Sequence, residues 1–198
     1  MSSSGRPPST SHEEIEAAAL ELFVSRGFEA TSVEDIAVAV GVVRRTIFRY
    51  FPSKNDIVWG DFDWVIERLR EHLDEGDSLP PAAALRRAAV LSNRYPAEQL
   101  PALRVRMTLI TTAPALQAHS MLRYAAWRGA VAEWAARRLG AAPDDLLPEV
   151  VGQVALGASM AAFSRWVRNP DEDLERCIDR SYRALGDHFP YHSPRSAG

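Results

Sequence analysis

The 198-residue sequence predicts an all-α protein of about nine helices, and three observations support this prediction. Apolar residues recur at the spacing of a helical face along most of the chain. Several of these segments open with Ser or Thr followed three residues later by an acid, which is a helix-capping pattern. No stretch alternates apolar and polar residues for long enough to indicate strands. Because 46% of the residues are hydrophobic, the chain can bury a sizeable core.

The first helix is expected after a flexible arm formed by residues 1–10. Ser11 with Glu14 has the spacing of a capping box. The apolar residues that follow, beginning with Ile15, keep to one face of a helix. Gly27 supplies the residue type at which helices commonly end.

Three more helices follow at short intervals. Thr31 with Glu34 predicts a helix that runs to about Val40. A second short helix is expected from about residue 43 to residue 51, where Pro52 follows. Ser53 with Asp56 predicts the start of a long helix that continues to about residue 73.

Beyond Gly76 the composition shifts towards Ala, Leu, Val and Arg. Proline-containing and glycine-containing segments divide this part into five further predicted helices, at about 81–95, 97–112, 115–139, 144–168 and 171–187. Asp144 and Asp171 are expected in the first turns of the last two. Residues 191–198 are expected to form a frayed tail.

The short second and third helices have the spacing of a helix-turn-helix motif, at about residues 33–52. This motif needs a small residue where its helices touch and a glycine at the turn. Ala37 and Gly41 meet these requirements. The residues expected to face inward are Ile36, Val40, Val42 and Ile47. We therefore expect an N-terminal helix-turn-helix domain over residues 11–57.

Charge on this motif is unlike that of the whole chain, whose formal net charge is -3. Residues 41–56 hold four cations and a single acid, Asp56. Acids facing a groove would repel phosphate, whereas Arg side chains bind phosphates and guanine edges. A cationic helix can also be a solvated surface, but the coincidence with the motif favours DNA. The expected DNA contacts are Thr31, Ser32, Val43, Arg44, Arg45, Thr46, Phe48, Arg49, Tyr50 and Lys54.

Residues 23–57, FVSRGFEATSVEDIAVAVGVVRRTIFRYFPSKNDI, resemble the DNA-binding domain of TetR-type transcriptional regulators. Three positions depart from the common pattern: Val43 replaces Ser or Thr, Arg45 a small residue, and Phe48 the commoner Tyr. The resemblance implies a homodimer of about nine helices that binds a pseudo-palindromic double-stranded operator. It also implies a C-terminal domain that binds a ligand and dimerises.

Residues 44–63 and 114–140 are similar to regulators encoded with mycofactocin biosynthesis genes. This narrower similarity implies a repressor of that redox-cofactor system. It further implies release from DNA by a small hydrophobic ligand, with long-chain acyl-CoA as the candidate.

Residues 58–190 are expected to form the ligand-binding and dimerisation domain. Aromatic and Met residues at helical spacing are ordinary core in most proteins, but they also line apolar cavities. His119 and Arg123, four residues apart, would give such a cavity a polar anchor. The candidate pocket residues are Trp59, Phe62, Met107, His119, Arg123, Trp127 and Phe163.

A second copy of the chain is the other expected partner of this domain. Residues 150–163 are apolar and rich in small side chains, which favours close helix packing. The next predicted helix adds an apolar face, so two helices from each subunit would form the interface. The residues expected there are Val151, Val154, Ala155, Ala158, Ala162, Leu174, Ile178 and Tyr182.

The sequence does not favour an enzyme. Cys177 has no His nearby in the sequence, and Pro190 interrupts the spacing of His188 and His192 that would suit a metal. No glycine-rich phosphate loop is present, and neither a metal nor a cofactor is expected. An architectural DNA-binding dimer without a ligand remains the alternative. With one cysteine, no secretory signal and no apolar run of roughly 20 residues, we expect a cytoplasmic protein without membrane association.

Overall fold

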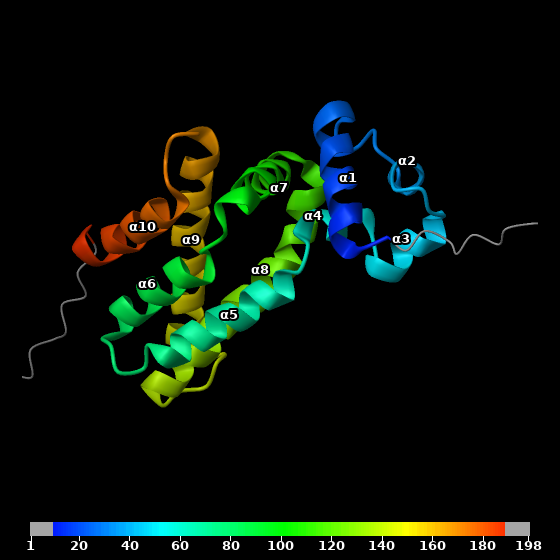
Figure 1. Ribbon diagram of the computed structural model, residues 1–198. Coiled ribbons are helices and arrows are strands. Elements are labelled where there is room, and N and C mark those ends of the chain that lie inside the picture. Colours follow the sequence, from blue (N-terminus) through cyan, green and yellow to red (C-terminus); the bar gives the residue numbers. More distant parts are fainter. Residues whose placement is uncertain (1–9, 189–198) are drawn as a thin grey trace, which may run out of the picture. The chain divides into compact units, whose positions relative to one another are not determined.

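The computed structural model describes residues 10–188, and all the regular secondary structure of this part of the chain is helical (Figure 1). It contains ten α-helices and one short 3-10 helix. The described residues form two compact units, one of residues 10–61 and 96–120, the other of 62–95 and 121–188. The all-α prediction is confirmed.

Unit 1 contains the N-terminal helices and a later part of the chain. Its helices are α1 (His12–Arg26), α2 (Val33–Ala39), α3 (Arg44–Tyr50), α4 (Lys54–Trp59), η1 (Ala97–Gln99), α7 (Leu100–Thr112) and the start of α8 (Pro114–Leu139). α1 packs against α2, α4 and α7, and α2 packs against α3. The unit therefore extends beyond the domain expected over residues 11–57.

Serine side chains cap three of these helices. Ser11 forms the expected capping box with Glu14 at the start of α1, and Ser53 accepts a hydrogen bond from the backbone N–H of Asp56 in α4. In α2, however, the cap is Ser32 with Asp35 rather than Thr31 with Glu34. The expected pair was therefore wrong by one residue.

The long helix expected from Ser53 to about residue 73 is interrupted at Gly60. α4 ends at Trp59, and α5 (Phe62–Glu75) begins two residues after Gly60. Gly60 has φ +58° and ψ −148°, a backbone conformation accessible almost only to glycine. This backbone turn makes two helices out of one apolar pattern.

Unit 2 contains α5, α6 (Pro81–Ser92), the rest of α8, α9 (Leu146–Arg168) and α10 (Leu174–His188). α10 packs against α9 and α6, and α5 packs against α6. α6 ends earlier than expected, and α9 and α10 begin two and three residues later than expected. Asp144 and Asp171 thus precede their helices instead of lying in the first turns.

The contact between α9 and α10 contains a small buried polar network. The Tyr182 hydroxyl donates to the carbonyl of Ala155 at 2.9 Å. Because this donation uses its one proton, the Ser159 hydroxyl donates to Tyr182, also at 2.9 Å. Burial raises the pKa of Tyr182, which keeps the phenol neutral.

The packing of α9 against α10 differs from the expected dimer interface, in which these helices would pack against a second subunit. Six of the eight expected residues are already buried within the chain: Ala155, Ala158, Ala162, Leu174, Ile178 and Tyr182. They are not available to a second subunit, because α9 and α10 bury these faces in one chain. Val151 is half-buried and Val154 is 45% exposed.

α9 is long and apolar enough, by length and composition, to cross a membrane, with a mean hydropathy of 1.4 in its most apolar window. Core helices of soluble proteins meet the same criterion, and one face of α9 is covered by α10. The expected tail 191–198, residues 1–9 of the expected arm, and His192 lie outside the described residues. Thr10, the last residue of that arm, is buried.

Candidate DNA-binding interface

The turn between α2 and α3 has the geometry of a helix-turn-helix. Gly41 has φ +69°, and the N–H of Val42 donates to the carbonyl of Ala37 at 2.9 Å. Of the five residues expected at the contact, Ile36, Ala37 and Ile47 are buried, while Val40 and Val42 are half-buried. This small, apolar contact fixes the direction of α3.

The outer surface of α3 is cationic. Arg44, Arg45 and Arg49 are exposed, together with Val43 and Phe48, whereas Thr46 and Tyr50 are half-buried. α3 contains no acidic residue. Since Arg45 and Arg49 are four residues apart, they lie on the same helical face, opposite buried Ile47.

The three arginines have different surroundings. Arg44 donates to Glu34 of α2 at 2.8 Å, and its guanidinium lies 5.1 Å from the ring centre of Phe48. Arg49 lies 5.2 Å from the ring centre of Tyr50. Arg45 makes no ion pair or ring contact within residues 10–188. Arg45 is therefore the arginine whose donors are most available to a partner.

Two of the expected DNA contacts, Thr31 and Lys54, form hydrogen bonds within the protein instead. Thr31 is 1% exposed, and its hydroxyl donates to the carbonyls of Gly27 and Leu22. Lys54 donates to the carbonyls of Phe28 and Thr31 at 2.8 and 3.0 Å, with its ammonium 4.2 Å from the centre of the Phe28 ring. Thr31 thus lies in the interior, and Lys54 holds the loop between α1 and α2.

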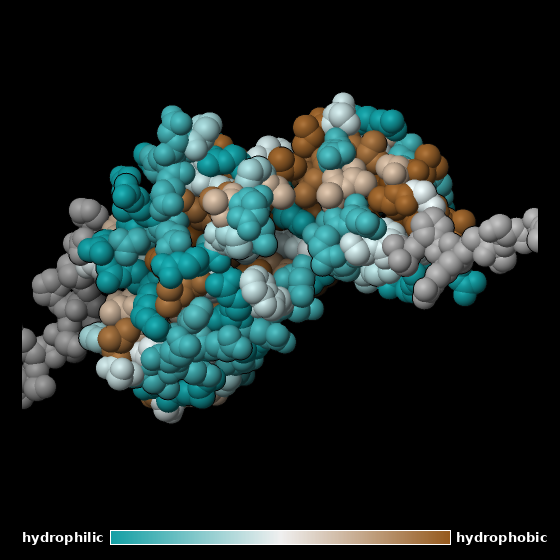
Figure 2. All heavy atoms as spheres, in the orientation of Figure 1, coloured by the Kyte–Doolittle hydropathy of each residue, from teal (hydrophilic) through white to brown (hydrophobic). Residues whose placement is uncertain are grey.

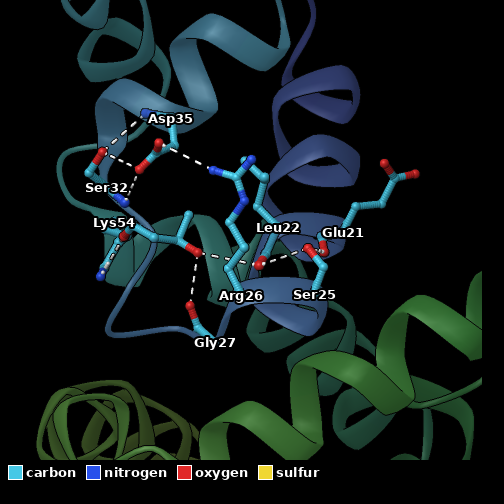
Figure 3. Close-up of polar contacts among 9 residues, drawn as sticks. Glu21, Leu22, Ser25, Arg26, Gly27, Ser32, Asp35 and Lys54 are labelled. Carbon is cyan, nitrogen blue, oxygen red and sulfur yellow. Dashed lines mark hydrogen bonds and ion pairs between the residues drawn. The ribbon is translucent and has the colours of Figure 1, made fainter.

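Ser32 and Tyr50 also have structural partners. Ser32 is exposed and caps α2 through Asp35, whose other carboxylate oxygen is paired with Arg26 (Figure 3). The hydrogen bonds from Ser32 lower the pKa of Asp35. Tyr50 donates its hydroxyl proton to the carbonyl of Thr10 at 2.7 Å, which ties α3 to the segment before α1.

One exposed large hydrophobic side chain of the motif is not among the residues expected from the sequence. Val38 of α2 is 80% exposed. The sequence held one sign of this exposure, because Val38 is not among the residues of α2 that were expected to face inward.

Figure 2 shows hydrophobic residues over α1 and α2 and hydrophilic ones over α5.

The expected pocket residues are divided between the two units. In unit 1, Trp59 and Met107 are buried and His119 Nε2 lies 3.2 Å from Asp56 Oδ1. In unit 2, Trp127 and Phe163 are buried, Phe62 is half-buried, and Arg123 is paired with Asp63 at 3.5 Å. The assignment of these residues to a ligand stays a prediction.

Two short helices around a glycine turn, the second of which has an exposed cationic surface without an acid, are the arrangement of a sequence-reading DNA-binding protein. Residues 15–58 match the model of the bacterial regulatory proteins of the tetR family, and residues 79–190 match the model of the MftR C-terminal domain. The chain belongs to the TetR family and is a transcriptional regulator.

Among curated relatives, the chain is 39% identical over 183 residues to MftR of Mycobacterium tuberculosis, a protein named for the regulation of mycofactocin biosynthesis. The match covers 92% of each chain. The chain is also 32% identical over 165 residues to the regulator TcmR of Streptomyces glaucescens, covering 79% of this chain and 73% of TcmR.

Solved structures share the fold. FadR of Thermus thermophilus, a repressor solved with lauroyl-CoA, aligns with a TM-score of 0.61 at 24% identity, covering 95% of this chain and 100% of FadR. FadR of Bacillus subtilis, solved with stearoyl-CoA, aligns with a TM-score of 0.58 at 19% identity and covers 89% of this chain and 96% of FadR.

The family and the relatives named above are transcriptional regulators rather than enzymes. The one cysteine, Cys177, is 3% exposed and its thiol donates to Glu172 Oε2 at 3.1 Å. Burial and the Glu172 carboxylate raise the pKa of the Cys177 thiol to about 11. The described residues include no group of three or more His, Cys, Asp or Glu placed to hold a metal.

Proposed function

We propose that this regulator is a cytoplasmic repressor that binds a pseudo-palindromic operator as a homodimer and leaves it when a hydrophobic small molecule binds. The observation that carries the proposal is the acid-free outer surface of α3, held by the α2–α3 turn. Arg45 and Arg49 supply free donors on the face opposite buried Ile47. Such donors bind phosphates and guanine edges and release counterions.

The proposed base-reading and phosphate-binding set is smaller than the sequence suggested. It comprises Val43, Arg44, Arg45, Thr46, Phe48 and Arg49 of α3, with Ser32 and Tyr50 at its edges. Thr31 is left out because it is buried, and Lys54 because its ammonium is bonded to two backbone carbonyls.

A second copy of this chain is proposed to pack on the face of α9 that α10 leaves open. Its exposed residues are spaced alternately three and four apart: Leu147, Val150, Val154, Gly157 and Ala161. This spacing is that of a helix seam that packs against another helix. Three of the side chains are large and apolar with 43–55% of their surface exposed, which favours an additional partner.

The proposed ligand is a long-chain acyl-CoA, and the proposed targets are genes of the mycofactocin system. The ligand is supported by the fold shared with two regulators solved with acyl-CoA molecules. The targets are supported by the match to the MftR C-terminal domain and by the 39% identity to MftR. An architectural DNA-binding dimer would share α3 but would not respond to a ligand.

The test is a gel-shift titration of the purified protein on the DNA upstream of its own gene, at fixed salt, with and without palmitoyl-CoA. We expect saturable binding that palmitoyl-CoA weakens, whereas free CoA and palmitate do not. Arg45→Ala is expected to weaken operator binding by at least tenfold. Arg137→Ala removes the same charge from an exposed ion pair with Asp74 in unit 2 and serves as the control.

Each result decides a different part of the proposal. Specific binding that ignores palmitoyl-CoA rejects long-chain acyl-CoA as the ligand and leaves the DNA-binding regulator standing. Equal losses for Arg45→Ala and Arg137→Ala reject α3 as the interface. Binding that does not distinguish upstream DNA from unrelated DNA rejects the operator.

A further inference from the structure

Three large hydrophobic side chains are exposed on the helix-turn-helix, and they differ in what surrounds them. Val38 is 80% exposed, Val43 70% and Phe48 40%. The ring of Phe48 is partly covered by the Arg44 guanidinium at 5.1 Å. Val38 belongs to α2, and in this motif the first helix crosses the DNA backbone rather than the bases. Val43 is therefore the exposed apolar side chain best placed for a base.

Val43 also occupies a position that disfavours valine. It is the N-cap of α3 and makes no side-chain hydrogen bond to the helix. The helices α1, α2 and α4 are each capped by a serine oxygen, from Ser11, Ser32 and Ser53. A missing cap costs about 1 kcal/mol of stability. Departures from local rules of this kind concentrate at functional sites.

The start of a recognition helix is the part that reaches base edges in the major groove. The apolar group displayed there is the C5-methyl of thymine, which distinguishes T from the other bases. A serine at this position would offer a hydroxyl, which bonds to several bases without distinguishing them. The two methyl groups of the Val43 side chain can contact an apolar group, and the C5-methyl of thymine is such a group.

We infer that Val43 is a specificity-determining residue that recognises a thymine methyl group in each operator half-site. The inference rests on the proposed operator binding and adds the chemistry of one contact to it. On this assignment Val43 selects T by apolar contact, while Arg45 and Arg49 supply most of the affinity.

The test removes the methyl group from the DNA. The upstream fragment is amplified with dTTP or with dUTP, which gives duplexes that differ only in the C5-methyl groups of T. Gel shifts at fixed salt give the dissociation constant for each duplex. The measured quantity is the dissociation constant for the uracil duplex divided by that for the thymine duplex. An unrelated fragment prepared both ways gives the baseline ratio. Burial of one methyl group corresponds to about a fourfold ratio per half-site, or about 15-fold for two.

The variant is Val43→Ser, which adds a capping oxygen and so is expected to raise the melting temperature. Its ratio of dissociation constants should fall about 15-fold below that of the wild type. Val24→Ser, at a 65% exposed valine of α1, is the control and should keep the wild-type ratio.

Three results would count against the inference. If Val43→Ser binds the operator and keeps the wild-type ratio, Val43 does not read a methyl group, although the proposed function stands. If both valine variants lower the ratio equally, the effect does not belong to α3. If the wild type binds the thymine fragment no better than unrelated DNA, the operator proposal fails and the inference fails with it.

Discussion

The guanidinium of Arg106 on α7 lies against the carboxylate of Glu16 on α1, with 2.5 Å between Nη2 and Oε2. Both side chains are only 16% exposed. The other terminal nitrogen of Arg106 donates to the carbonyls of Ile57 and Val58, in the last turn of α4. These carbonyls have no partner within a helix. One arginine thus connects three helices of unit 1.

Arg106→Ala is expected to lower the free energy of unfolding by about 3 kcal/mol, because it leaves the largely buried carboxylate of Glu16 with only the His12 ring beside it, at 3.3 Å. Arg106→Lys should restore only part of the loss, since an ammonium cannot serve both sides as the planar guanidinium does. Urea denaturation followed by circular dichroism measures both changes. Arg137→Ala breaks an exposed pair with Asp74 and should cost less than about 1 kcal/mol.

Gly60→Ala is expected to lower the free energy of unfolding by about 2–3 kcal/mol. A Cβ at this position would lie 2.7 Å from Arg106 Nη1 and 2.9 Å from Glu16 Oε1, in a backbone conformation with φ +58°. Because the same contact is lost, the cost should not add to that of Arg106→Ala in the double variant.

Gly129→Ala is the matched control for Gly60→Ala. It lies within α8, where a Cβ meets nothing within 4 Å. It should be neutral or stabilising by up to about 1 kcal/mol. Additive effects of Gly60→Ala and Arg106→Ala would contradict the view that they act on one contact.

Val154→Glu is expected to convert the proposed homodimer into a monomer. Val154 lies in the exposed seam of α9, so the new charge would be buried against its symmetry mate in a two-fold dimer. Sedimentation velocity measures the change in mass. Val24→Glu, on α1, should leave the dimer intact. A dimeric Val154→Glu variant would show that another surface joins the subunits.

Glu172 makes stability depend on pH. The hydrogen bond from Arg165, and then that from the Cys177 thiol, lowers the pKa of Glu172 from its ordinary 4.5 to about 2. A lowered pKa means that the fold favours the charged carboxylate. The stabilisation is therefore complete above pH 4.5 and is lost as the pH falls from 4.5 to about 2.

Comparing the urea midpoints of the wild type and Glu172→Gln between pH 2 and 6 tests this dependence. The wild type should be more stable at pH 6, and the two curves should converge near pH 2. High salt should reduce the difference in part, because the Glu172 side chain is partly exposed and its partner Arg165 is about half exposed. A difference that stays constant across this range would show that charge is not the cause.

The helices of the DNA-binding motif were predictable because local chemistry decides them. Gly41, the inward apolar residues and the serine caps all act within a few residues of one another. The choice between Thr31 and Ser32 could not be made locally, since both have an acid three residues later. It is decided by the carbonyls of Leu22 and Gly27, which bind the Thr31 hydroxyl.

Lys54 and Gly60 illustrate why the rest was not predictable. A lysine in the first turn of a helix suggests a phosphate contact, but carbonyls more than 20 residues away bind its ammonium. Gly60 lies in an otherwise helical apolar pattern, and only the approach of Arg106, from 46 residues later in the chain, shows why the helix ends there. Three of the expected dimer residues on α9, Ala155, Ala158 and Ala162, are buried within the chain for the same reason, because packing between distant segments decides which face is covered.

Unit 1 is formed by two separate segments of the chain, which limits how this regulator can be truncated or fused to another. The family model of the DNA-binding region ends at residue 58, and Arg106 is far beyond it. A fragment that stops there retains Glu16 and the last carbonyls of α4 but loses the side chain that binds them. Chimeras that exchange DNA-binding domains between regulators should therefore include residues 96–120 together with residues 10–61.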